Sequence, residues 1–239
     1  MSVARSLLYA LANVLHPRML WLMLWPMLVA LALWGSAALF AWGWLAVRVA
    51  AWLRQALDYA LAWSHVDFAT ATLVAANVLL FIAFVPLVYL TALVILSLFG
   101  MQQMVDYVAR RSFPELERRR GGGVAGSGWN SVLALLGMLV LGLLSIPLWL
   151  FPPLWPIIPL VILGWVNQRL LRYDALAEHA DAAEMARIFR SQRAPLYVLG
   201  VLLALAAYVP VVGFFAPVLF GLAFIHYLLG ALATQRGAA

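Results

Sequence analysis

Two proline-bearing breaks in apolar sequence are the features of this chain best placed to do chemistry. They lie at residues 147–159 and 210–217, and a new helix is expected to start near Pro153 and near Pro217. A helix start carries free backbone N–H groups and a partial positive charge, and paired interrupted helices form anion sites in membrane transporters. We therefore expect a small-anion site at these tips, with Arg18 as one electrostatic contact at its entrance. The alternative is that the prolines only turn two hairpins.

The chain offers few side chains for other chemistry. Ser64, His65 and Asp67 are neighbours in sequence, but a catalytic triad needs a nucleophile, a base and an orienting group that meet in space. The absence of cysteine excludes a disulfide framework and a thiolate metal site, and it leaves the redox compartment open. We expect no catalytic residue, no metal and no cofactor, so an enzyme is the least favoured class of function.

Further polar residues have structural interpretations. Glu178, His179 and Asp181 could serve as metal ligands or as an acid/base pair, but a solvated amphipathic helix explains them better. His226 could relay protons, although a hydrogen bond at a helix end is the simpler interpretation. A third group is expected to bond to neighbouring helices rather than to a ligand, namely Asn77, Thr72, Thr91 and Ser97.

The elements that would position these residues are helices in a membrane. Of the 239 residues, 67% are hydrophobic and 10% are charged, against roughly 25% charged in a soluble domain. Every charged residue falls outside four blocks, 19–47, 68–105, 129–168 and 194–235, and each block exceeds the ~20 residues that cross a bilayer. Continuous apolar runs do not match the alternating pattern of a membrane β-barrel. The sequence therefore predicts an all-α integral membrane protein with a single domain over residues 1–239.

The blocks and their connections also predict an order of elements. A short amphipathic helix at the membrane interface comes first, two long transmembrane helices follow, and two proline-tipped hairpins make up the second half. The predicted segments are 1–18 (interfacial helix), 19–47 and 68–105 (long transmembrane helices), 106–128 (mobile Arg/Gly-rich cytoplasmic linker), 129–168 (first hairpin), 169–193 (cytoplasmic amphipathic helix) and 194–235 (second hairpin).

The hairpins either cross the bilayer or enter it partway and return. As helices, segments 154–168 and 195–209 would each cover about 22 Å, which is less than the roughly 30 Å of hydrocarbon. This length favours partial penetration. Hairpins that do not span leave apolar flanks uncovered, and a homo-oligomer would bury them.

Charge distribution indicates the topology and excludes one class of partner. All 15 positive charges are arginine, and they lie between the apolar blocks rather than on one face interleaved with aromatic residues, which excludes nucleic acid. Placing both termini, 106–128 and 169–193 on one side gathers 13 arginines there, so that side is expected to be cytoplasmic. Anionic lipids could contact the linker arginines, which are Arg110, Arg111, Arg118, Arg119 and Arg120.

Short proline and glycine motifs mark the hairpin tips and the end of the second long helix. They are Ile146-Pro147 with Pro153-Leu154-Trp155, Val209-Pro210 with Pro217, and Leu98-Phe99-Gly100. In this order, over roughly residues 4–232, they resemble the CysZ family of bacterial sulfate permeases, which shares its domain with the etoposide-induced membrane proteins of eukaryotes.

The resemblance implies a multi-pass protein of the bacterial inner (cytoplasmic) membrane that takes up sulfate or a similar small oxyanion. The four apolar blocks contain no carboxylate for ion coupling, which favours a passive, channel-like route. The implied anion-binding residues are Arg18, Gly100, Pro153, Leu154, Gly213 and Pro217.

The sequence departs from the family pattern at this expected site. Pro17 is followed by Arg18 alone, where adjacent basic residues are usual, and Gly213 stands where an asparagine is common. The resemblance therefore supports the family's fold for this chain more strongly than it supports the family's ligand. A non-transporting membrane scaffold or assembly protein of the same fold is therefore the alternative function.

Overall fold

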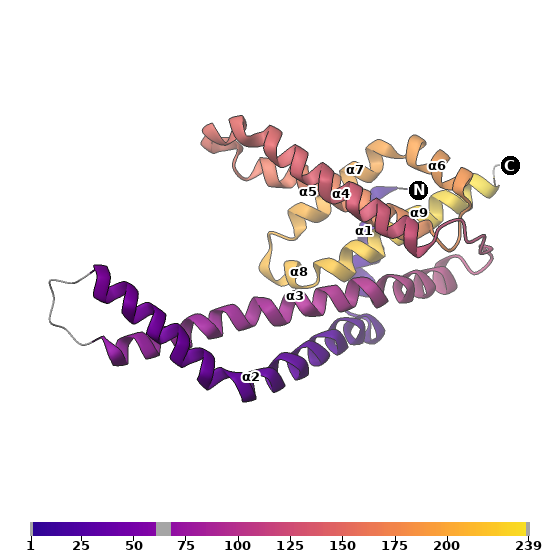
Figure 1. Cartoon of the computed structure of the whole chain (residues 1–239). Helices are drawn as coiled ribbons and strands as arrows, with labels where there is room; N and C mark the ends of the chain where they lie inside the picture. The colour runs from indigo at the N-terminus through magenta and orange to yellow at the C-terminus, as the bar shows by residue number, and fades with distance from the viewer. Residues whose placement is uncertain (1, 61–67, 238–239) are drawn as a thin grey trace. The chain divides into compact units, whose positions relative to one another are not determined.

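Every regular element in the described part of the chain is a helix. The structure is a computed structural model that describes residues 2–60 and 68–237 (Figure 1). Its elements are α1 (Val3–Val14), α2 (Pro17–Ala60), α3 (Ala69–Ser112), α4 (Val124–Ser145), η1 (Ile146–Leu150), η2 (Pro152–Leu154), α5 (Ile157–Leu176), α6 (Ala182–Ser191), α7 (Arg193–Ala206), α8 (Pro210–Phe214) and α9 (Ala216–Gly237). Within these residues, five helices are long and apolar enough to cross a membrane. The predicted all-α membrane fold class is confirmed.

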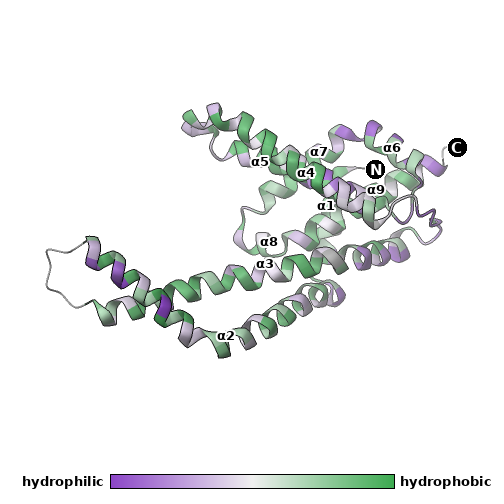
Figure 2. Ribbon diagram, viewed as in Figure 1, coloured by the Kyte–Doolittle hydropathy of each residue, from purple (hydrophilic) through white to green (hydrophobic). Residues whose placement is uncertain are grey.

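The two long helices are longer than the apolar blocks that predict them. α2 and α3 have 44 residues each, or about 66 Å at the rise of an α-helix. Both continue into charged sequence because no glycine or proline follows Val47 or Val105 within the helix. In Figure 2 hydrophobic residues run along most of both helices, and hydrophilic residues gather toward their C-terminal parts.

The chain divides into two compact units. One lies within Met1–Leu20 and Phe99–Ala239, and the other lies within Trp21–Leu98. In the second unit, Trp42 Nε1 donates to Asn77 Oδ1 and Trp34 Nε1 donates to Thr91 Oγ1, both at 2.9 Å. These bonds join α2 to α3, as predicted for Asn77 and Thr91.

The prediction of interhelical bonds is wrong for the other two residues of that predicted group, Thr72 and Ser97. Thr72 Oγ1 donates to the carbonyl oxygens of Phe68 and Ala69, and Ser97 Oγ donates to that of Val94. Hydroxyl groups of serine and threonine reach back to carbonyls of the preceding turn, and this satisfies them without a second helix.

Helix α9 forms the centre of the first unit. Helices α1, α5 and α7 pack against it, and its residues from Leu222 to Gly230 are all buried. The rings of Tyr9 and His226 stack with centroids 4.1 Å apart, and Ser6 Oγ lies 3.2 Å from His226 Nδ1. His226 therefore joins α1 to the middle of α9, and the expectation that it lies at a helix end is wrong.

Helix α1 turns its small and polar residues toward the protein and its leucines outward. Ser6 and Asn13 are buried, whereas Leu8 and Leu11 are 67% and 51% exposed. This orientation suits a helix whose outer side contacts lipid at the membrane surface.

The hairpins have unequal arms. α4 and α5 form the first hairpin, with η1 and η2 at its tip, and α7 and α9 form the second, with α8 at its tip. α5 continues past Gln168 to Leu176 because neither glycine nor proline follows Gln168 in the helix, and charge alone does not end one. Its 20 residues cover about 30 Å, but the part after Gln168 carries Arg169, Arg172 and Asp174, and the 14 residues of α7 cover about 21 Å. Partial penetration stays a prediction for both hairpins.

The two hairpins cross where α5 and α7 carry glycine. A Cβ atom at Gly200 would overlap the carbonyl oxygen of Gly164, and a Cβ at Gly164 would press on the Val201 side chain. Small residues at such a crossing let two backbones approach closely, which is how membrane helices gain packing contacts.

The segment between α3 and α4 is bound to the protein, and this differs from the mobile linker that its glycines predict. Backbone N–H groups of residues 120–122 donate to carbonyl oxygens of residues 177–180 at 2.9–3.0 Å. A Cβ at Gly121 would overlap the backbone of Asp181. The glycine therefore permits close approach here, rather than freedom of movement.

Candidate functional site

The residue expected at the anion entrance, Arg18, lies at the start of α2. His16 caps this start: its carbonyl oxygen accepts the N–H groups of Met19 and Leu20 at 2.8 and 3.0 Å, and its Nδ1 accepts that of Arg18 at 3.3 Å. The Arg18 side chain is exposed and forms no hydrogen bond or ion pair with the described residues. With respect to the described residues, the Arg18 side chain is thus a free cation, but the N–H groups of Arg18, Met19 and Leu20 are already bonded to His16.

A polar network fixes the turn that carries Arg18. Tyr107 OH donates to Asn13 Oδ1 at 3.1 Å, Arg111 Nη1 donates to Tyr107 OH at 3.3 Å, and the His16 ring lies 5.3 Å from the Tyr107 ring. These contacts hold the α1–α2 turn against the C-terminal part of α3. Sequence reasoning missed this role of Tyr107 and Arg111, although their i,i+4 spacing in a helix is a detectable signal.

The two hairpin tips meet through one weak hydrogen bond. Tyr208 OH, at the end of the second hairpin's first arm, lies 3.5 Å from the carbonyl oxygen of Pro156 in the first tip. Trp155 Nε1 donates to the carbonyl of Trp149 at 2.8 Å and closes the first tip on itself. The helix that leaves this tip starts at Ile157, so its positive end lies beyond the expected Pro153.

The other expected site residues lie in separate elements. Pro153 and Leu154 form part of η2, Gly213 lies in α8, Pro217 lies in the first turn of α9, and Gly100 is buried in α3. Of the described contacts, the Tyr208–Pro156 hydrogen bond links the ends of the two hairpins, but it involves none of these residues. Among the described residues, no hydrogen bond or ion pair joins Arg18 to either tip, and the binding role of all six residues stays a prediction.

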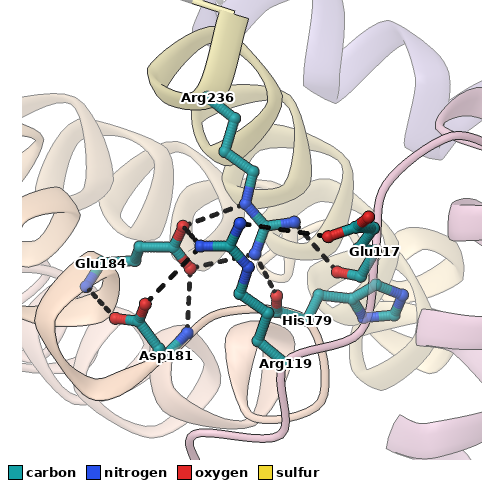
Figure 3. Close-up of polar contacts among 6 residues, drawn as sticks. All are labelled: Glu117, Arg119, His179, Asp181, Glu184 and Arg236. Atoms are coloured by element: carbon teal, nitrogen blue, oxygen red, sulfur yellow. Dashed lines mark hydrogen bonds and ion pairs between the residues drawn. The ribbon is translucent and has the colours of Figure 1, made fainter. Parts of the chain in front are cut away.

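The strongest electrostatic cluster of the described chain surrounds Glu184 on α6 (Figure 3). The Glu184 side chain is only 4% exposed. Arg236, in the last turn of α9, donates two hydrogen bonds to it, from Nε to Oε1 at 3.0 Å and from Nη2 to Oε2 at 2.9 Å. Arg119 Nη1 adds a third contact at 3.0 Å. These hydrogen bonds, first of all the one from Arg236, lower the pKa of Glu184 to about 2.

The same cluster accounts for two of the residues that could have formed a metal or acid/base site. Asp181 caps α6 by accepting the Glu184 N–H at 2.7 Å, and Glu184 Oε2 accepts the Asp181 N–H at 2.9 Å, which completes a capping box. His179 is buried, and burial together with Arg118 lowers its pKa. Within the described ranges, no group of three or more His, Asp or Glu side chains is placed to hold a metal. Ser64, His65 and Asp67 lie outside the described residues.

One family of known proteins matches this chain. A family model described as "Sulfate transporter CysZ/Etoposide-induced protein 2.4" matches residues 6–217. That range includes most of α1, both long helices, the first hairpin, α6, and the first arm and tip of the second hairpin. No curated protein and no solved structure matches the chain.

Proposed function

Because the chain belongs to the sulfate transporter CysZ/etoposide-induced protein 2.4 family, we propose that it carries sulfate or a similar small oxyanion across a membrane. The family match over residues 6–217 is the observation that carries this proposal. The five helices long enough to span a membrane agree with it. We place the protein in the bacterial inner membrane, with both termini in the cytoplasm and as a homo-oligomer.

The proposed route is passive and channel-like. Coupling to protons or sodium usually needs a carboxylate at membrane depth, and residues 19–47, 68–105, 129–168 and 194–235 contain none. Asp174 lies beyond these blocks, in the last turn of α5, and accepts a hydrogen bond from Ser127 Oγ at 2.6 Å. It is therefore not a carboxylate within an apolar block.

In this proposal Arg18 attracts the anion and the hairpin tips receive it. Arg18 supports the first step because its exposed side chain has no internal partner among the described residues. The start of α5 supports the second step because its dipole directs partial positive charge toward the first tip.

Radiolabelled sulfate uptake into liposomes tests the proposal. The purified protein should admit sulfate faster than protein-free vesicles do, with or without a proton gradient, and other oxyanions should compete. Dependence on the gradient would overturn the passive route. Absence of uptake by folded, inserted protein would overturn transport itself.

A non-transporting scaffold is the second candidate, and the cap at Arg18 favours it. His16 already accepts the N–H groups of Arg18, Met19 and Leu20, so this helix start offers an anion one arginine and little else. A scaffold should give no sulfate uptake and should retain a protein partner at fixed ratio through purification in mild detergent.

A further inference from the structure

The arginines of this protein fall into two groups that sequence position does not separate. In the linker, Arg118 pairs with Asp106 and Glu178, and Arg119 pairs with Glu184. Carboxylates of the protein therefore already balance these two charges, although the sequence suggests them as lipid contacts.

Two arginines of α6 have no carboxylate partner among the described residues. Arg187 and Arg190 are exposed, and neither forms a hydrogen bond or an ion pair with any residue that the structure describes. They lie three positions apart and therefore on the same side of the helix. The nearest carboxylate of α6 along the chain, that of Glu184, is held by Arg236 and Arg119.

These two arginines line a groove between α6 and the end of α9. The groove has a volume of about 590 Å³, and its polar lining comes from Arg187, Arg190, Ser191, Gln192, Thr234 and Gln235. Ile188 and Ala231 add apolar surface. Within the part of the chain that the structure describes, the groove thus combines two uncompensated cations, amide donors and an apolar floor.

The orientation of α6 suits a groove at a membrane surface. α6 and α7 meet at an angle of 74°. α7 is apolar, and its Val198 and Leu202 side chains are 47% and 39% exposed, as expected of a helix that enters lipid. If α7 runs into the membrane, α6 lies nearly along its surface, at the level of the lipid headgroups.

We propose that the groove between α6 and α9 binds the phosphate of an anionic phospholipid headgroup. Arg187 and Arg190 supply the charge, and the side-chain amides of Gln192 and Gln235 can donate hydrogen bonds. The hydroxyl groups of Ser191 and Thr234 donate to the backbone carbonyls of Ile188 and Gly230. Apolar atoms of the floor face the glycerol and the upper acyl chains. This site differs from the oxyanion route in its residues and does not depend on transport.

Binding of short-chain phosphatidylglycerol to the full-length protein in a neutral detergent tests the proposal. Titration followed by the shift in melting temperature gives an apparent affinity. The double variant Arg187→Gln with Arg190→Gln should bind about 30-fold more weakly, since an arginine near anionic lipid contributes roughly fivefold. The variant Arg187→Lys with Arg190→Lys keeps both charges and should bind within about fivefold of the unmodified protein.

The matched control removes the same charge elsewhere. Arg5→Gln with Arg48→Gln changes two exposed arginines outside both the groove and the linker and should leave the affinity within about twofold. Equal weakening in the control and groove variants would overturn the site in favour of diffuse attraction. Equal protection of the unmodified protein by inorganic phosphate would overturn the lipid assignment, and so would equal protection by phosphatidylcholine.

Discussion

Arg236 of α9 holds Glu184 of α6 by two parallel hydrogen bonds, and two further N–H groups donate to the backbone carbonyls of Glu117 and His179. One side chain therefore ties the end of the chain to α6, to the turn before α6 and to the segment between α3 and α4. The carboxylate is almost completely buried, so the pair is sensitive to the loss of either partner.

The first prediction concerns this ion pair. Arg236→Gln should destabilise the protein by about 3 kcal/mol, because it leaves the buried carboxylate of Glu184 with the Arg119 side chain and the Asp181 N–H as its described partners. Melting followed by tryptophan fluorescence in detergent measures the change. Arg110→Gln, which removes an exposed arginine with no partner among the described residues, is the control and should change stability by less than about 0.5 kcal/mol. Equal melting temperatures for the two variants would contradict the role of the pair.

The second prediction concerns acid. The pKa of Glu184 is about 2 in the folded protein and near 4.5 when the chain is unfolded, so the unfolded state takes up its proton first as the pH falls. The stabilisation is complete above about pH 5 and is lost as the pH falls toward 2. Melting temperatures between pH 6 and about pH 3 should therefore fall more steeply for the unmodified protein than for Glu184→Gln. Parallel curves would show that other carboxylates dominate.

The third prediction concerns the crossing of α5 and α7. Gly200→Val should destabilise the protein by roughly 2 kcal/mol or more, because the new side chain overlaps the backbone of Gly164. Gly142→Val places the same side chain in α4, where nothing lies within 4 Å of the Cβ position. Thermal unfolding of the two variants compares a blocked position with an open one, and similar losses would argue against a close crossing.

The fourth prediction concerns the second unit. Trp42→Phe and Asn77→Ala each remove one side of the 2.9 Å bond between α2 and α3. A double-mutant cycle should give a coupling free energy of about 0.6 kcal/mol, the usual size for a hydrogen bond between membrane helices. Trp34→Phe with Asn77→Ala pairs residues that do not bond to each other and should give additive effects, so equal coupling in both cycles would count against the bond.

The fifth prediction concerns the anion entrance. Arg18→Gln should lower sulfate uptake into liposomes severalfold without changing the melting temperature, because the side chain has no partner among the described residues whose loss could destabilise the fold. Arg5→Gln, another arginine of the N-terminal segment, serves as the comparison and should retain uptake. Uptake unchanged by Arg18→Gln would remove that residue from the route.

The sequence predicts the helical membrane class well because blocks without charge have one physical explanation in lipid. It also identifies Asn77 and Thr91 as interhelical partners, since polar groups inside such a block need a partner. It misplaces the end of the helix at Gln168, because charged residues mark where the membrane ends and not where a helix ends.

The electrostatic cluster could not be predicted in the same way. Glu184 and Arg236 are far apart in the chain, and neither has a spacing that marks the pair. Only the packing of α6 near the end of α9 brings them together. The glycines at 121 and 122 are visible in the sequence, but their effect is ambiguous. A residue without a side chain permits a flexible linker, and it equally permits the backbone to pack directly against a neighbouring backbone.

The backbone contact between residues 120–122 and residues 177–180 requires the segment between α3 and α4 to have a fixed length. The N–H groups of residues 120, 121 and 122 each donate to one particular carbonyl oxygen, those of residues 178, 180 and 177 respectively. An inserted or deleted residue would shift every donor past its acceptor and move Arg118 and Arg119 away from their carboxylates. A surface connection normally tolerates such changes, but this one should vary in composition only where its side chains are exposed, and hardly at all in the number of residues.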